Sequence, residues 1–365
     1  HTARTGVSDF MKPGDISQLS QSADVAFRVQ FEGDIPPRSE LYWRGLVFSR
    51  LEDGAWRRLK YFDLPPGQRR PVPTETAGES LRYTVIMEAT QQNWLYSLRY
   101  AEGVTPGIME TADFLLYSPV IVEDEYLYRV ESWPQVALEF DLGGWRRDTE
   151  LKLPPAENPQ TLQLARDLRA QSGSDAAFVQ AVLSHFNTQP FVYTLQPLPL
   201  QDFNSMDQFM FQTRRGFCEH YAYAFVVMMR AAGVPARVVA GYQGGELNPV
   251  NKTVIVHQFD AHAWAEVWLK GEGWVRFDPE VFPLECGMDL GVPESPGSVP
   301  HCRESLHQRQ GDPGGVRIQN GESPPPFRRI GQTSVFGGSS GQSLQDFRVP
   351  SREPVPFPID PLLEL

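Results

Sequence analysis

The chain has 365 residues, of which 41% are hydrophobic and 12% aromatic, which fits two folded domains and an additional segment. Its formal net charge of −12 argues against a general nucleic-acid-binding protein, because an acidic surface repels phosphates. No run reaches the roughly 18 apolar residues that span a bilayer, and no signal-peptide pattern follows His1. Because the chain begins with His1 and not with Met, we expect an excised or processed piece, with any targeting or membrane segments removed.

Residues 1–152 are predicted to form an all-β domain, a barrel or a sandwich. After a polar arm with a short strand near Phe10, residues 25–31 alternate apolar and polar side chains, as a half-buried strand does. Further strands are predicted at 41–48, 55–59, 81–87, 93–98, 115–122, 126–130 and 136–140. Short strands at near-even spacing are typical of sandwiches and barrels. We interpret their aromatic residues as core and cross-strand packing rather than as a ligand face.

Residues 153–284 are predicted to form an α+β catalytic domain. Helices are expected from Asn158, from a cap at Ser174, as one or two turns at 206–211, and over 219–232, where Gly233 ends the helix. An extended run at 191–195 and strands at 236–242, 253–256, 263–269 and 273–277 are also expected. Because helices precede an antiparallel sheet, a doubly wound α/β fold is disfavoured. Residues 285–365 are rich in Pro, Gly and Ser and predict a flexible tail.

Cys218 is the cysteine whose setting suggests chemistry. It follows Gly216 and begins a predicted helix, where the helix dipole is expected to lower the thiol pKa and backbone amides to stabilise an oxyanion. Cys286 and Cys302 lie in the tail and would pair only in an oxidising compartment, which stays open.

A base and its orienting carboxylate are expected on a hairpin. His262 begins one strand, Asp278 ends the next, and both lie nearly equidistant from the turn at 270–273. Pairing of the strands would bring them together, as in a catalytic triad. Three other histidines are weaker candidates for the base: His185, His220 and His257.

Four sequence blocks resemble the transglutaminase-like superfamily: GFCEH at 216–220, AGVPARVVAGY at 232–242, HAWAEV at 262–267 and WVRFDP at 274–279. The resemblance implies a papain/transglutaminase-like core with a Cys218, His262 and Asp278 triad. It implies transfer of an acyl group from a glutamine carboxamide to a primary amine or to water. The β-rich N-terminal part resembles the periplasmic domain of bacterial TgpA-like membrane proteins, which implies a location outside the inner membrane.

The resemblance also implies secondary roles and partners. Tyr193 is a candidate oxyanion donor, and Trp264 is interpreted as pocket wall or core. From their own positions, Glu219 is interpreted as a structural helix-start acid and Arg237 as a strand residue paired to a nearby carboxylate. Protein or peptide substrates that carry a glutamine and a primary amine are the expected partners, with no nucleic acid. No cofactor or metal is expected, and no acidic loop of the EF-hand type suggests calcium.

Two other functions stay open. A cysteine protease or amidase would use the same three residues, and a non-catalytic interaction module would present the fold as a binding surface. The tail departs from the TgpA-like pattern, in which apolar segments would be expected after Pro279.

Overall fold

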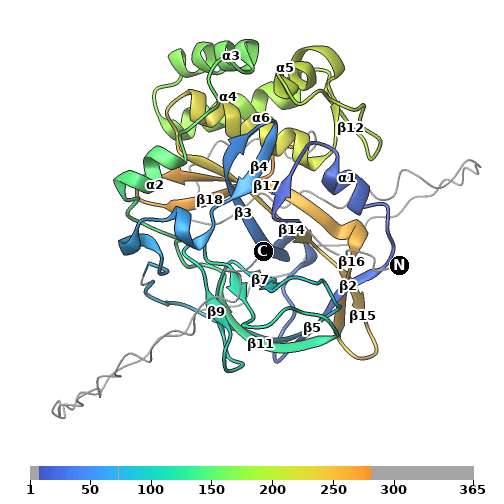
Figure 1. Ribbon diagram of the computed structural model, residues 1–365. Helices are drawn as coiled ribbons and strands as arrows, with labels where there is room; N and C mark the ends of the chain where they lie inside the picture. Colours follow the sequence, from blue (N-terminus) through green and yellow to red (C-terminus); the bar gives the residue numbers. More distant parts are fainter. Residues whose placement is uncertain (1–7, 73, 281–365) are drawn as a thin grey trace, which may run out of the picture. The chain divides into compact units, whose positions relative to one another are not determined.

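Two antiparallel sheets hold most of the strands in residues 8–72 and 74–280, the part of the chain that the computed structural model describes (Figure 1). The first sheet has the order β1-β4-β3-β14-β17-β18, and β7 also pairs with β3. Its strands are β1 (Phe10–Met11), β3 (Tyr42–Glu52), β4 (Ala55–Arg58), β7 (Ser97–Leu98), β14 (Ala236–Gln243), β17 (Ala261–Leu269) and β18 (Gly273–Phe277).

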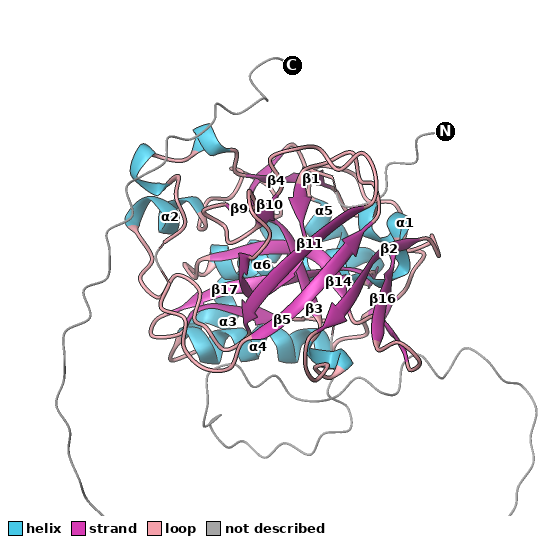
Figure 2. Ribbon diagram, turned by 90° about the horizontal axis from the view of Figure 1, so that it is seen from below, coloured by secondary structure: helices cyan, strands magenta, loops and turns pink. Residues whose placement is uncertain are grey.

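The second sheet has the order β15-β16-β2-β5-β11-β8, and Figure 2 shows several of its strands in the foreground. Its strands are β2 (Val25–Phe31), β5 (Leu81–Met87), β8 (Tyr100–Gly103), β11 (Tyr126–Trp133), β15 (Glu246–Asn248) and β16 (Thr253–His257). Two smaller sheets contain β6 (Trp94–Leu95), β9 (Met109–Glu110) and β10 (Leu116–Tyr117), and the parallel pair β12 (Val192–Tyr193) and β13 (Arg215–Gly216).

Both large sheets combine strands from the two halves of the sequence. In the first, β14 lies between β3 and β17, and in the second, β16 pairs with β2. Strands from before and after residue 152 therefore share both sheets. The change in sequence pattern near residue 152 is real, but a domain boundary there stays a prediction. The expected tail, with Cys286 and Cys302, lies outside the described residues.

Most of the helices lie in the second part of the sequence, from Pro159 onward. They are α1 (Asp15–Leu19), α2 (Gly144–Thr149), α3 (Pro159–Ala170), α4 (Asp175–Thr188), α5 (Ser205–Asp207) and α6 (Cys218–Ala231). Short helical turns lie at η1 (Arg38–Glu40), η2 (Tyr61–Asp63), η3 (Pro66–Gln68), η4 (Gln208–Thr213) and η5 (Gln258–Asp260). Figure 1 shows α3, α4, α5 and α6 together on one side of the first sheet. The prediction of a mixed α+β core with a β-rich N-terminal region is confirmed.

The helix that begins at Cys218 is the centre of the core. Every residue of α6 except Ala231 is buried, and Gly233, two residues after the end of the helix, has a φ of 79° that allows the left-handed turn there. Its apolar side chains pack against β17, where Ala263, Ala265 and Val267 present small or branched side chains. These residues alternate along the strand, so the other face of β17 carries His262, Trp264 and Glu266.

The predicted aromatic core is confirmed. Trp43 is completely buried, and its ring lies 5.5 Å from that of Phe27, which in turn stacks on Tyr96 at 5.4 Å. Tyr242 of β14 closes the cluster with ring contacts to both Phe27 and Tyr96. Since these residues come from both sheets, the cluster holds the β-rich part and the catalytic part together.

Three details of the N-terminal prediction were wrong. The segment 136–140 is not a strand: only Leu138 forms a bridge, to Trp274, and Glu139 has a φ of 50° that interrupts an extended ladder. The run at 115–122 contains only the two-residue strand β10. The region is also not all-β, because it contains α1 and α2, which are five and six residues long and give little helical periodicity to detect.

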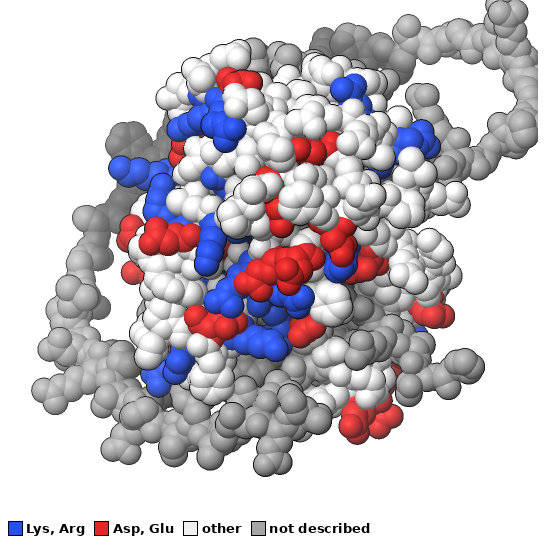
Figure 3. All heavy atoms as spheres, turned by 45° about the horizontal axis from the view of Figure 1, so that its top comes forward, with Lys and Arg blue, Asp and Glu red and all other residues white. Residues whose placement is uncertain are grey.

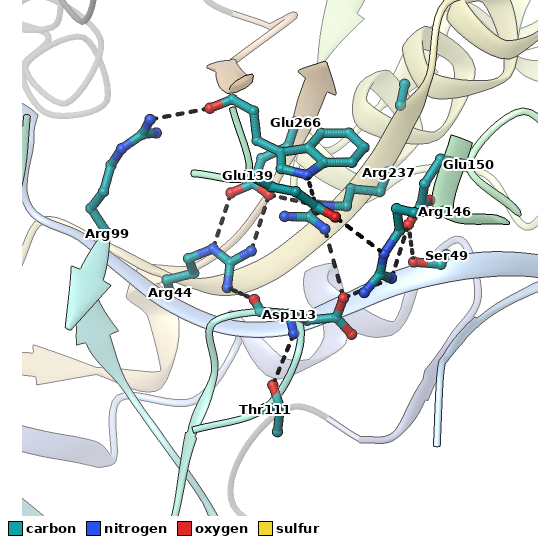
Figure 4. A network of polar contacts seen from close by, with 12 residues as sticks. Arg44, Ser49, Arg99, Thr111, Asp113, Glu139, Arg146, Glu150, Arg237 and Glu266 are labelled. Atoms are coloured by element: carbon teal, nitrogen blue, oxygen red, sulfur yellow. Dashed lines mark hydrogen bonds and ion pairs between the residues drawn. The ribbon is translucent and has the colours of Figure 1, made fainter. Parts of the chain in front are cut away.

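Charged side chains are buried between the two halves of the chain (Figure 4). Glu266 on β17 accepts two hydrogen bonds from Arg44 of β3, each 3.0 Å, and one of 2.9 Å from Arg237 of β14. Farther along, Arg146 pairs with Asp113 at 2.9 Å. The ion pair expected for Arg237 is thus confirmed, and Glu266 links β3, β14 and β17 through its two arginine partners.

Candidate active site

Cys218 is the first residue of α6 and is completely buried. The turn before it is tight: a Cβ at Gly216 would lie 2.7 Å from His220 Cβ and 2.7 Å from Phe209. His220 accepts a hydrogen bond from the backbone N–H of Phe217 at 3.2 Å, and burial lowers its pKa to about 4. His220 therefore holds the start of the helix as a neutral side chain, and it does not replace His262 as the base.

His262 and Asp278 meet at the far ends of the β17–β18 hairpin. His262 Nε2 lies 2.8 Å from Asp278 Oδ1, and both side chains are 6% exposed. The register pairs Ala265 with Phe277, as the sequence-based hairpin requires. The carboxylate thus fixes the imidazole orientation, and Nδ1 is left as the ring nitrogen that can face a thiol.

The sulfur of Cys218 lies against the residue that follows this histidine. The backbone N–H of Ala263 points at Sγ, at 3.4 Å. The structure therefore brings the helix N-terminus, the start of β17 and the end of β18 to one place. The sequence assigned a thiol, an imidazole and a carboxylate to these three elements.

The electrostatics of the thiol differ from the expectation. Burial raises the pKa of Cys218 well above its ordinary value, and the carboxylates of Glu219 and Glu280 raise it further. The N–H of Ala263 acts in the opposite direction. The helix dipole was expected to lower this pKa, but burial of the sulfur, together with the neighbouring carboxylates, shifts it in the opposite direction.

The protonation equilibrium of His262 is shifted toward the charged imidazolium. Burial alone would disfavour the imidazolium, but the carboxylates of Asp278 and Glu280 outweigh it and raise the pKa of His262 to about 9. Glu280 Oε1 lies 3.1 Å from the same Nε2. One ligand atom from each of these three side chains lies within 4.8 Å of the others, so they could hold a metal ion. A metal on Nε2 would compete with the contact to Asp278.

Two residues at the site were missed by the sequence analysis. Tyr42 of β3 donates a hydrogen bond to Asp278 Oδ2, and its ring packs edge-on against Trp264 at 5.3 Å. Glu280 is the second carboxylate on the histidine. Tyr42 is 236 residues from Asp278, and no local pattern predicts such a contact. For Glu280 the available signal was its closeness in sequence, since it lies two residues after Asp278 in the turn that follows β18.

Tyr193 and Trp264 lie on different sides of the candidate catalytic residues. Tyr193 of β12 pairs with Gly216 in the two-stranded sheet, and its half-exposed ring lies 5.1 Å from that of Phe217. It is thus beside the loop that carries the nucleophile. Trp264 is 1% exposed and stacks near His262, with ring centres 6.1 Å apart. Its position supports the imidazole from within the protein.

The remaining rival histidines are engaged elsewhere. His257 stacks on Phe259, with ring centres 4.6 Å apart, at the end of β16. His185 lies on α4 against Phe186 and Phe191, and burial lowers its pKa. Neither makes a contact with Cys218 among those seen in the described residues.

Comparison with known proteins identifies both parts of the chain. Residues 1–139 match the family described as the TgpA N-terminal domain, and residues 162–279 match the transglutaminase-like superfamily. Over 295 residues the chain is 45% identical to the protein-glutamine gamma-glutamyltransferase of Pseudomonas aeruginosa, covering 79% of this chain and 43% of that protein. The Bacillus subtilis protein YebA is 33% identical over 138 residues, which are 36% of this chain and 19% of that one. The chain thus spans less than half the length of these relatives.

A solved structure matches the fold as well. The crystal structure of the periplasmic domain of TgpA from Pseudomonas aeruginosa is 44% identical and superposes with a TM-score of 0.70, covering 75% of this chain and 94% of that one. The same domain bound to ethylmercury gives a TM-score of 0.71 and 96% coverage of its chain. The resemblance read from the four sequence blocks is confirmed: the chain belongs to the transglutaminase-like superfamily, in its group of TgpA-like proteins.

Proposed function

We propose that this protein is a cysteine-dependent acyltransferase of the transglutaminase type. The observation that carries the proposal is the hydrogen bond from His262 to Asp278 beside the buried thiol that begins α6. The name of the Pseudomonas aeruginosa relative, protein-glutamine gamma-glutamyltransferase, supports the same reaction class.

The first half-reaction assigns one step to each of these groups. In its neutral form, His262 accepts the proton of Cys218 at Nδ1, and the sulfur attacks the carbonyl carbon of a glutamine carboxamide. The oxyanion that forms is stabilised by backbone N–H groups at the start of α6, with Tyr193 as a candidate further donor. The imidazolium returns the proton to the leaving nitrogen, ammonia departs, and a thioester remains on Cys218.

The second half-reaction uses the same groups in reverse. A primary amine approaches the thioester, His262 accepts its proton, and the nitrogen attacks the carbonyl carbon. Collapse of the tetrahedral species expels the thiolate, which is reprotonated by the imidazolium. Asp278 holds the ring throughout and stabilises its charged form. If water replaces the amine, the product is glutamate, so exclusion of water decides between transfer and hydrolysis.

The decisive test is incorporation of a fluorescent primary amine into a glutamine-bearing protein such as casein. Cys218→Ala should abolish incorporation and leave the circular dichroism spectrum unchanged. Cys302→Ala is the matched control, since it removes a cysteine that is not assigned to the triad, and it should retain full activity. Equal incorporation by wild type and Cys218→Ala would refute the proposal.

The same assay separates the alternative reaction. A protease or amidase would cleave a peptide bond through Cys218, with no ammonia released from glutamine side chains. Mass spectrometry of a glutamine-containing peptide, with and without added amine, distinguishes a gain of the amine from chain cleavage. A non-catalytic module would produce neither.

Location and partners form part of the proposal. The periplasmic origin of the TgpA domain supports a location outside the bacterial inner membrane for this chain. In the described part of the chain, no helix is long and apolar enough to cross a membrane. We expect protein substrates and no cofactor. On the face in Figure 3, Lys and Arg are interspersed with Asp and Glu among the described residues, which offers little to a nucleic acid.

A further inference from the structure

Glu219, the residue next to the nucleophile, occupies an unusual position. Its side chain is 0% exposed, although an acid at a helix start normally faces water. One carboxylate oxygen, Oε2, lies 3.5 Å from the sulfur of Cys218. The other, Oε1, accepts backbone hydrogen bonds from Gly14 at 3.0 Å and from Ser17 at 3.3 Å.

The second set of contacts joins Glu219 to the short helix α1, more than 200 residues earlier in the sequence. The same helix reaches the other catalytic element. Ser20, at its end, donates a hydrogen bond of 3.4 Å to the carbonyl of Ala261, the residue before His262. Helix α1 therefore connects the residue after the nucleophile to the residue before the base.

We propose that Glu219 is a positioning residue that keeps the Cys218 thiol protonated at rest and couples it to α1. The inference builds on the proposed function, because it assigns the control of that nucleophile. A carboxylate 3.5 Å from a sulfur, with both groups out of water, repels a thiolate and favours the protonated thiol. If the carboxylate moved away, the thiol could lose its proton more easily, and the hydrogen bonds from Gly14 and Ser17 of the α1 region to Glu219 would break.

His220, which lies beside Glu219, does not cancel the effect. His220 Nδ1 lies 3.8 Å from Oε1 but accepts the N–H of Phe217, so this histidine is neutral. The described titratable groups that face the pair are His220 and Tyr223 on α6, Asp15 on α1, His262 on β17, and Asp278 and Glu280 after β18. Burial raises the pKa of Glu219 to about 7, so its carboxylate is ionised in the range above pH 7 where the thiol titrates.

The test measures the thiol directly. The rate of alkylation by iodoacetamide is followed between pH 6 and 11, in a background with Cys286→Ser and Cys302→Ser so that only Cys218 reacts. The thiolate displaces iodide, and the thiol proton goes to solvent, so the rate reports the thiolate fraction. Glu219→Gln keeps one acceptor oxygen and removes the charge. It should lower the apparent pKa of the thiol by about one unit, which is about tenfold in rate on the rising part of the profile.

Asp15→Asn is the matched control. It removes a charge from the same side of the site without a contact to the sulfur, and the thiol pKa should stay at its wild-type value. A purely structural Glu219 would change the melting temperature of the Gln variant and leave the thiol pKa unmoved, which would overturn the proposal. An equal shift in Asp15→Asn would overturn it too, because the effect would then be one of general charge.

A second measurement needs no substitution at Glu219 and so remains decisive if that variant does not fold. Alkylation of Cys218 displaces the neighbouring carboxylate, so amide hydrogen exchange at Gly14 and Ser17 should accelerate at least several-fold. Exchange in β5 should not change. Unchanged exchange in α1 would exclude the coupling. Neither readout requires turnover, so an absence of transferase activity would refute the proposed function and leave this inference standing on its own result.

Discussion

Tyr42, on a strand near the beginning of the chain, donates a hydrogen bond to Asp278 at the end of the catalytic hairpin. Asp278 uses its other oxygen to hold His262. The two oxygens of one carboxylate thus connect the N-terminal β-rich region to the imidazole. Because β3 pairs with β14, which pairs with β17, the sheet order itself brings Tyr42 to this position. In this protein the N-terminal region completes the site as well as covering it.

Tyr42→Phe should therefore weaken catalysis while the fold persists. Loss of one hydrogen bond to a charged group costs about 1.5–3 kcal/mol, so kcat should fall by about tenfold or more with little change in KM. Tyr61→Phe serves as the control, since Tyr61 is 52% exposed and far from the triad in sequence. Steady-state amine incorporation provides the measurement, and an unchanged kcat in Tyr42→Phe would show that the hydroxyl does not support Asp278.

Asp278→Asn should have a larger effect, because it removes the acceptor that fixes the imidazole. Loss of the orienting carboxylate in a triad reduces kcat by about 10³- to 10⁴-fold. The apparent pKa of His262 should also fall, since Asp278 is the leading charge that raises it. Activity and an NMR titration of the imidazole measure the two effects separately. A variant with wild-type kcat would remove Asp278 from the triad.

The pH dependence of stability follows from the same pair. The folded-state pKa of His262 is about 9, above its ordinary value of 6.5, so the ion pair stabilises the fold fully below pH 6.5. This contribution is lost as pH rises through about 9. The difference in unfolding free energy between wild type and Asp278→Asn should therefore shrink from pH 6 to pH 9.5. Urea denaturation measures it, and a difference that grew with pH would contradict the assignment.

Local patterns predicted the parts of the site that lie close together in sequence. The hairpin that joins His262 and Asp278 was readable because the turn fixes its register. The helix that begins at Cys218 was readable because Gly233 ends an apolar run of helical length. The family blocks then assigned roles to these residues.

Contacts between segments far apart in the chain could not be predicted from the sequence. The hydrogen bonds from α1 to Glu219 span more than 200 residues, and α1 itself is too short to show a period. The direction of the thiol pKa shift was missed for the same reason: the start of a helix is visible in the sequence, but the burial of the sulfur and the carboxylates beside it are tertiary features. The strand expected at 136–140 failed because Glu139 turns to accept a hydrogen bond from Trp274 Nε1.

The glycine before the nucleophile gives a further prediction. Gly216→Ala places a Cβ 2.7 Å from both His220 and Phe209, so the loop or the histidine must move. Such overpacking typically costs about 1–3 kcal/mol of stability, and a shifted sulfur should lower kcat as well. Gly173→Ala is the control, because a Cβ there meets nothing within 4 Å. Thermal unfolding and amine incorporation test the pair, and equal melting temperatures would rule out the close approach.

Removal of the buried carboxylate of Glu266 is predicted to cause the largest loss of stability. It receives hydrogen bonds from Arg44 and Arg237, and the charge of Arg44 is the leading interaction that lowers its pKa against the opposing effect of burial. Glu266→Ala leaves both guanidinium groups buried without this partner, which should destabilise the protein by about 3–5 kcal/mol. Glu272→Ala, in the exposed turn of the same hairpin, should change stability by less than about 0.5 kcal/mol. Denaturant unfolding of the two variants measures both changes in the free energy of unfolding. A small loss in Glu266→Ala would mean that Asp113 and Glu139 can take over the two arginines, and that β3 and β17 are held together mainly by apolar packing.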